Sequence, residues 1–66
     1  MNLLEAINHA AASLPPLWNI RLVVENGAGW VELVDPLGDV METPLTETLA
    51  GDINEAVQVA ISKEVP

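Results

Sequence analysis

The side chains most able to do chemistry in this 66-residue chain are its carboxylates. Asp and Glu together number ten, Lys and Arg together number two, and there is one His and no Cys. From residue 25 to residue 55 the carboxylates follow one another with no Lys or Arg between them. Same-face strand residues lie about 7 Å apart, so a hairpin and its loops can hold carboxylates in an array that imitates a nucleic-acid backbone. We expect such an array to attract a basic groove.

The candidate partner-binding residues are Glu25, Glu32, Asp35, Asp39 and Glu42, followed by Glu47 and Asp52. Turns and helix starts offer a simpler role for some of them, because Asp35 and Asp39 flank a Pro-Leu-Gly turn while Asp52 and Glu55 suit a helix start. That role does not explain the missing cations.

Catalytic and metal sites are not expected. Without cysteine the chain has no thiolate ligand or Cys nucleophile. His9 is its one histidine, and a single histidine is too few for a metal or catalytic site built from histidines. Ser13 and Ser62 lack a base and an orienting acid, and the glycines match no phosphate-binding loop. We therefore expect a protein that is not an enzyme and that has no catalytic residues, no metal and no cofactor.

The net charge of −8 and the pI of about 4.1 argue against direct nucleic-acid binding and against anionic membranes, and they favour a basic protein partner. An acidic surface also keeps small proteins in solution, and this interpretation has equal weight. No cationic leader precedes Arg21, and the uncharged run from Ala6 to Ile20 is too short to span a bilayer. We expect a cytoplasmic protein.

The elements that position these residues can be read from periodicity. Asn2 and Glu5 predict a capping box for a helix over Leu3–Ser13, and Pro15-Pro16 predicts its end. Its expected apolar stripe consists of Leu3, Ile7, Ala10, Ala11 and Leu14.

Alternation predicts strands over Trp18–Glu25, Trp30–Asp35 and Val40–Thr43. Asn26-Gly27 is a hairpin signal, and Ala28-Gly29 are candidates to widen the loop. Cys-free and 66 residues long, the chain is expected to form one domain over residues 1–66.

A last helix is predicted over Ile53–Lys63, with Asp52 and Glu55 as cap and acid and with a start near Pro44 or near Asp52 left open. Its expected apolar face consists of Ile53, Ala56, Val57, Ala60 and Ile61. The order predicts a two-layer α+β fold, helix–strand–strand–strand–helix, in which a three-stranded antiparallel meander carries both helices on one face.

The two tryptophans have different expected roles. Trp18 is expected in the core, on the strand face that also holds Ile20, Leu22 and Val24. If Val31 and Leu33 face inward, an apolar patch of Trp30, Val23 and Val34 forms on the open sheet face; a one-residue slip would instead bury Trp30. Such a patch is typical of a partner surface or a weak homodimer.

In its size, its element order, its lack of cysteine and its acidic segment from Glu25 to Glu55, the chain resembles the small acidic phage-encoded anti-CRISPR proteins, particularly inhibitors of type I-C systems. The resemblance covers the whole chain and includes no diagnostic motif. It implies a non-catalytic DNA mimic that occupies the DNA- or PAM-binding surface of a Cas subunit in a type I surveillance complex, in the host bacterial cytoplasm. The alternative is a structural, assembly or regulatory module that homodimerises or docks through its apolar sheet face.

Overall fold

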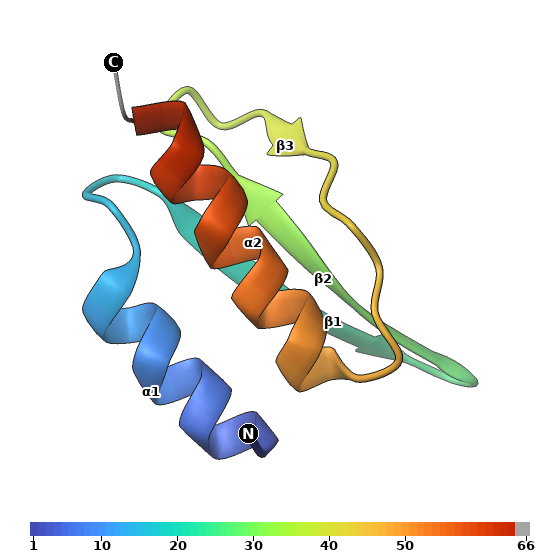
Figure 1. Cartoon of the computed structure of the whole chain (residues 1–66). Coiled ribbons are helices and arrows are strands. Elements are labelled where there is room, and N and C mark those ends of the chain that lie inside the picture. The colour runs from blue at the N-terminus through green and yellow to red at the C-terminus, as the bar shows by residue number, and fades with distance from the viewer. Residues whose placement is uncertain (65–66) are drawn as a thin grey trace.

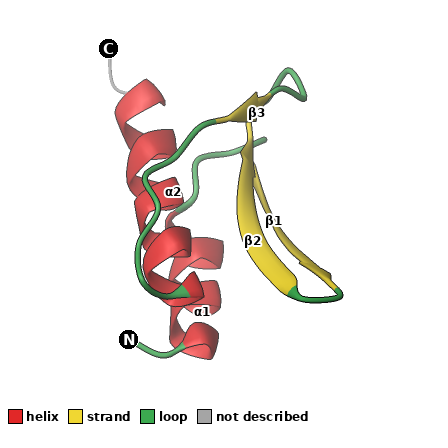
Figure 2. Cartoon of the chain, turned by 90° about the vertical axis from the view of Figure 1, so that its right-hand side faces the viewer, coloured by secondary structure: helices red, strands yellow, loops and turns green. Residues whose placement is uncertain are grey.

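The computed structural model describes residues 1–64 of the chain. Its elements are α1 (Leu3–Ser13), β1 (Asn19–Glu25), β2 (Ala28–Val34), β3 (Val40–Met41) and α2 (Leu49–Glu64). The strands form one antiparallel sheet in the order β1-β2-β3, and both helices lie on the same side of it (Figures 1 and 2). The predicted two-layer α+β arrangement is confirmed, and the molecule is elongated, measuring 38 × 24 × 17 Å.

Helix α1 begins where its capping signal predicts. The Asn2 side chain accepts a hydrogen bond from the Glu5 N–H at 2.8 Å, and the Glu5 carboxylate accepts one from the Asn2 N–H at 3.0 Å. These two bonds satisfy backbone donors that a helix start leaves free. The helix ends at Ser13, before the two prolines.

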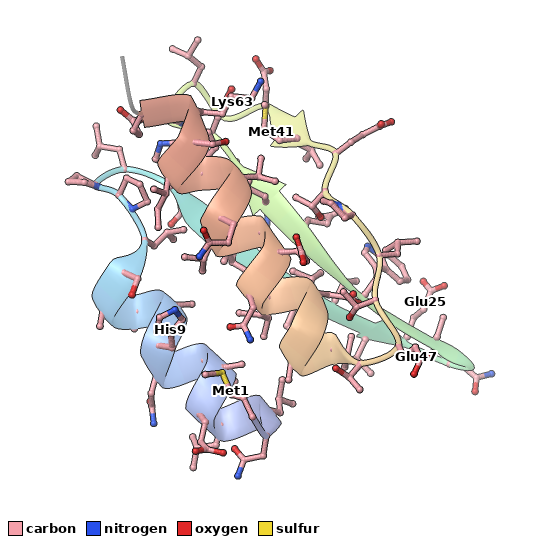
Figure 3. All side chains as sticks on the ribbon, viewed as in Figure 1. Met1, His9, Glu25, Met41, Glu47 and Lys63 are labelled. Carbon is pink, nitrogen blue, oxygen red and sulfur yellow. The ribbon has the colours of Figure 1, made fainter. Side chains whose placement is uncertain are left out.

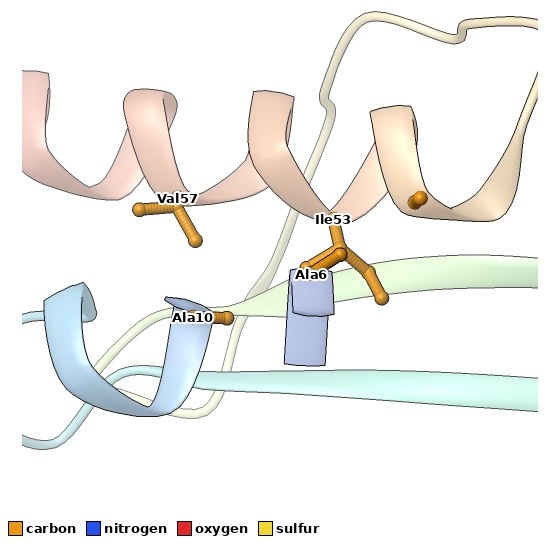
Figure 4. Packing of buried hydrophobic residues seen from close by; sticks show 5 residues of the cluster. Ala6, Ala10, Ile53 and Val57 are labelled. Carbon is orange, nitrogen blue, oxygen red and sulfur yellow. The ribbon is translucent and has the colours of Figure 1, made fainter. Parts of the chain in front are cut away.

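The buried face of α1 differs from the predicted stripe. Its buried residues are Ala6 and Ala10, which pack with Ile53 of α2 (Figure 4). Ile7 is instead 43% exposed. The predicted stripe is therefore only partly buried, because alanines of α1 make the contact with α2 while Ile7 lines an open space beside β1.

Strands β1 and β2 are joined by a tight turn at Asn26 and Gly27, where Gly27 adopts a φ of +85° that favours glycine. The register pairs Glu25 with Ala28, so Ala28 and Gly29 belong to β2. The prediction that these two residues widen the loop is wrong. Strand β3 is also shorter than its predicted range of Val40–Thr43.

The sheet uses its two faces as the alternation predicts. Ile20, Val31 and Met41 pack against the buried core beneath the helices, and Leu33 is fully buried there. Trp30 is paired with Val23. Because neighbouring strand residues face opposite sides of a sheet, Trp30 lies on the outer face while Val31 faces the helices. The expected register of β2 is therefore confirmed.

Helix α2 begins at Leu49, between the two predicted starts. The Thr48 hydroxyl accepts a hydrogen bond from the Gly51 N–H at 3.0 Å, as an N-cap residue does. The Asp52 N–H already bonds to the Thr48 carbonyl at 3.0 Å, so the predicted capping role of Asp52 with Glu55 is wrong. Thr48 supplies the cap four residues earlier.

The core has two parts that share Leu14, Ile20 and Val31 as partly buried neighbours. Between the helices lie Ala6, Ala10, Ala50, Ile53 and Val57. Between α2 and the sheet lie Trp18, Leu33, Ala56 and Ala60. Trp18 is therefore a core residue as predicted, and its indole N–H donates to the Glu64 carboxylate at 2.5 Å. The expected inner face of α2 is buried except for Ile61, which is half-buried.

Candidate interaction surfaces

Two of the candidate carboxylates lie in the sheet. Glu25 is exposed at the end of β1, near the tip of the hairpin (Figure 3). Glu32 is half-buried on the outer face of β2, opposite Arg21. Its carboxylate accepts a hydrogen bond from the Trp30 indole N–H at 3.4 Å. Glu25 is thus free to meet a partner, whereas Glu32 is already engaged by its neighbours.

The turn between β2 and β3 holds the next two. Asp35 Oδ1 accepts the N–H groups of Leu37 at 3.0 Å and of Asp39 at 2.8 Å. The Asp35 carbonyl also accepts the Gly38 N–H at 2.9 Å. Asp35 therefore shapes the turn, and it leaves the exposed Asp39 side chain pointing to solvent.

The segment between β3 and α2 carries Glu42 and Glu47, both exposed. Figure 3 places Glu47 just before α2, far along the helix from Lys63. Asp52 differs because it is only 9% exposed. Its Oδ1 accepts the Thr46 N–H at 2.6 Å and the Thr46 hydroxyl at 2.9 Å. Asp52 is a structural group that fixes the segment before α2, and it is not available to a partner.

The carboxylates thus occupy several elements and do not form one flat array on the sheet. The exposed set contains Glu25, Asp39, Glu42 and Glu47. Both cations of the chain, Arg21 and Lys63, lie outside the stretch of sequence that contains this set. The set therefore places exposed negative charge on the hairpin, the second turn and the segment before α2.

The predicted apolar patch on the outer sheet face is reduced. Trp30 and Val23 face each other across the two strands and are both half-buried. Val34 is only 7% exposed. Trp30 and Val23 are available as a contact surface, and Val34 adds little to it.

A second apolar surface, not predicted from the sequence, lies between α1 and β1. It is an open groove of about 320 Å³ lined by Ile7, Ala10, Ala11, Leu14, Ile20, Leu22 and Ile53. The signal was present, because the predicted stripe of α1 and the predicted inner face of β1 both contain residues of this groove. What the sequence could not show is that the two faces stay apart.

Metal-ligating and nucleophilic side chains are the remaining candidates for chemistry in residues 1–64. No three His, Cys, Asp or Glu side chains of this part gather where they could hold a metal ion. His9 Nδ1 lies 3.5 Å from the Ser13 hydroxyl on the exposed side of α1, with no acid contacting the ring among the described hydrogen bonds. This pair lacks the orienting group that nucleophilic catalysis requires.

No helix within residues 1–64 has the length and apolar character needed to cross a membrane. Comparisons with protein-family models, with curated proteins and with solved structures find no match to this chain.

Proposed function

We propose that the chain is a non-enzymatic inhibitor that binds a basic nucleic-acid-binding protein and excludes its nucleic acid by mimicking DNA charge. The observation that carries this proposal is the exposed set of Glu25, Asp39, Glu42 and Glu47 with no Lys or Arg among them. A surface with one sign of charge steers a partner of opposite sign and speeds its association.

The dimensions support a mimic of a short duplex. The longest extent of the protein is 38 Å, which corresponds to about eleven nucleotide steps at about 3.4 Å per step along one strand. A folded backbone can present its carboxylates to Lys and Arg side chains with a smaller loss of ordering entropy than a flexible acidic tail.

The target class comes from the resemblance to acidic anti-CRISPR proteins. We propose that the partner is a Cas subunit of a type I surveillance complex, that the contact covers its DNA- or PAM-binding surface, and that inhibition takes place in the bacterial host cytoplasm. Binding is stoichiometric, and no reaction is catalysed.

The test is inhibition of target-DNA binding by a type I surveillance complex, measured by electrophoretic mobility shift with increasing amounts of the protein. We expect inhibition that weakens as salt rises from about 50 to 200 mM, because the contacts are between charges. The variant Glu42→Lys with Glu47→Lys is expected to weaken inhibition at least about tenfold, because neither carboxylate makes a described side-chain hydrogen bond that folding would lose.

A matched variant separates local contacts from net charge. Glu42→Lys with Glu47→Lys changes the charge from −8 to −4, since each replacement adds two. Replacing exposed residues of the helices gives the same −4 by four single steps: Asn8→Lys, Ala12→Lys, Gln58→Lys and Ser62→Lys. Retained inhibition by this helix variant supports the proposed surface. Unchanged inhibition by the folded Glu42 and Glu47 variant would contradict it.

A further inference from the structure

The free edge of β1 lies beside an apolar groove that nothing in residues 1–64 fills. Strand β1 pairs only with β2, so its other edge has no strand partner in the sheet. Helix α1 packs against α2 and barely touches the sheet. Figure 1 shows α1 displaced to the side of β1 away from β2 and β3, and Figure 2 shows the hairpin curving away from the helices.

The register determines which backbone groups of β1 point outward. Residues facing each other in an antiparallel pair alternate between bonded and non-bonded pairs, and a two-residue turn closes on a bonded pair, here Glu25 with Ala28. Arg21 and Val23 therefore bond to β2 as well. The N–H and C=O groups of Ile20, Leu22 and Val24 point to the free edge.

The side chains of those same three residues face the helices. Leu22 is 41% exposed and Val24 is 74% exposed, because α1 stands too far to the side to cover them. Ile20 and Leu22 line the groove together with Ile7 and Ala11 of α1. An extended chain placed along this edge gains backbone hydrogen bonds on one side and apolar contacts on the helix side.

We propose that this groove accepts an extended strand from a partner protein, and that the partner strand alternates apolar with basic residues. The strand adds to the sheet next to β1. Its apolar side chains enter the groove beneath α1, and its basic side chains lie on the outer face. Strand addition is a known mode of peptide recognition, in which backbone bonds supply affinity and pockets for alternate side chains supply specificity.

Charge argues for a basic strand. The outer face of β1 ends at the exposed Glu25, and the chain as a whole carries −8. Arg21 is the one outer-face cation of β1, and it stands opposite Glu32. A Lys or Arg of the partner strand is therefore attracted to the Glu25 end, and acidic strands are repelled by the protein as a whole.

A second copy of the chain is a poorer occupant. Pairing β1 with β1 of another molecule brings both pairs of helices over one face of the joined sheet, where each α1 already extends past the edge (Figure 1). It also brings together two molecules that each carry −8. The strand site and the exposed carboxylate set share Glu25, but the groove beside α1 and the carboxylates of Glu42 and Glu47 can be altered separately, so either proposal can fail while the other holds.

The experiment uses the full chain and a synthetic peptide of seven residues, the length of β1, in which Lys and Val alternate. Amide hydrogen exchange is followed by NMR with and without the peptide. We expect the amides of Ile20, Leu22 and Val24 to exchange at least about tenfold more slowly with the peptide. The amides of Arg21 and Val23, already bonded to β2, are expected to change little.

Two controls test the apolar contacts in the groove and the backbone hydrogen bonds separately. Ala11→Trp obstructs the groove, whereas Ala12→Trp alters the neighbouring exposed alanine that does not line it; we expect only the first to abolish protection. A peptide N-methylated on its pairing edge keeps its side chains but lacks the donors, and we expect it to give no protection. It tests the backbone bonds without any change to the protein.

Several results would overturn the proposal. Binding that leaves the three outward amides unprotected shows that the peptide does not pair with β1. Equal protection by a Glu and Val peptide rules out the basic chemistry. Equal loss of protection in the Ala11 and Ala12 variants rules out the groove. Protection that arises at high protein concentration without peptide, with a doubled mass in sedimentation, assigns the edge to a second copy.

Discussion

The two helices of this protein meet the sheet in different ways. Beneath α2 the contact is filled, and Leu33, Ala56 and Ala60 are all fully buried there. Beside α1 the facing side chains stay apart, so Ile7 and Leu22 are each more than 40% exposed. Both helices have an amphipathic sequence and both lie on one side of the sheet, yet only one of them forms a closed layer with it.

The difference shows what an apolar face does and does not determine. An amphipathic pattern indicates which side of an element avoids water, and it leaves open which element covers that side. A sheet of three strands, one of them only two residues long, gives α2 a full partner but ends beneath α1. The exposed apolar area beside β1 is therefore a consequence of sheet width, and a fourth strand would cover it.

The largest expected effect contrasts one leucine from each region. Leu33→Ala empties a fully buried position and should destabilise the protein by about 2–5 kcal/mol, from lost transfer energy and the cavity left behind. Leu22→Ala in the open groove should cost less than about 1 kcal/mol. Urea unfolding followed by tryptophan fluorescence measures both. Equal losses would show that the groove closes in solution.

Adding volume should show the opposite asymmetry at a smaller scale. Ala56→Leu forces three carbons into a fully buried site and should cost about 1–3 kcal/mol through overpacking. Ala11→Leu places the same atoms in the open groove and should leave the stability within about 0.5 kcal/mol. Thermal unfolding by circular dichroism compares the two variants. A loss at Ala11 as large as that at Ala56 would contradict an open groove.

The smallest expected effect is at Gly51, on the closed side. In an exposed helix Gly→Ala stabilises by about 1 kcal/mol. A Cβ on Gly51 would instead run into the Thr46 hydroxyl and lie 3.0 Å from Thr46 Cβ, where Thr46 bonds to Asp52. We expect Gly51→Ala to destabilise by about 1 kcal/mol. Gly51→Ala with Thr46→Ala is compared with Thr46→Ala alone, because Thr46→Ala removes the hydroxyl that the new Cβ would meet. A stabilised Gly51→Ala protein would show that this segment is loosely held.

The sequence predicted the fold well where residues close in sequence determine the local structure. The capping box of Asn2 and Glu5 sets the start of α1, and the alternation of Val31 and Leu33 sets the faces of β2. The start of α2 was harder, because its cap lies at Thr48 and glycine follows at Gly51 within the first turn. Glycine is a poor helix former, and its presence is explained by Thr46 packing against it.

The sequence identifies the candidate carboxylates, but it does not show which of them are exposed to a partner. Glu25, Asp39, Glu42 and Glu47 are exposed, whereas Asp52 is buried by contacts with Thr46, six residues away. No periodicity signals such a contact, because it depends on how an irregular segment folds back onto the helix that follows it. Sequence alone therefore overstates the number of carboxylates that a partner can reach.

The sequence by itself determined the charge, the absence of cysteine, the order of the elements and the two faces of the sheet, because these depend on composition and on contacts between near neighbours. Only the tertiary structure decided that Ala6 and Ala10 bring the helices together, that Asp52 is buried, and that α1 and β1 leave a groove between them. These features depend on the widths of packed elements and on which small residues permit close approach, and both arise only when segments distant in sequence meet.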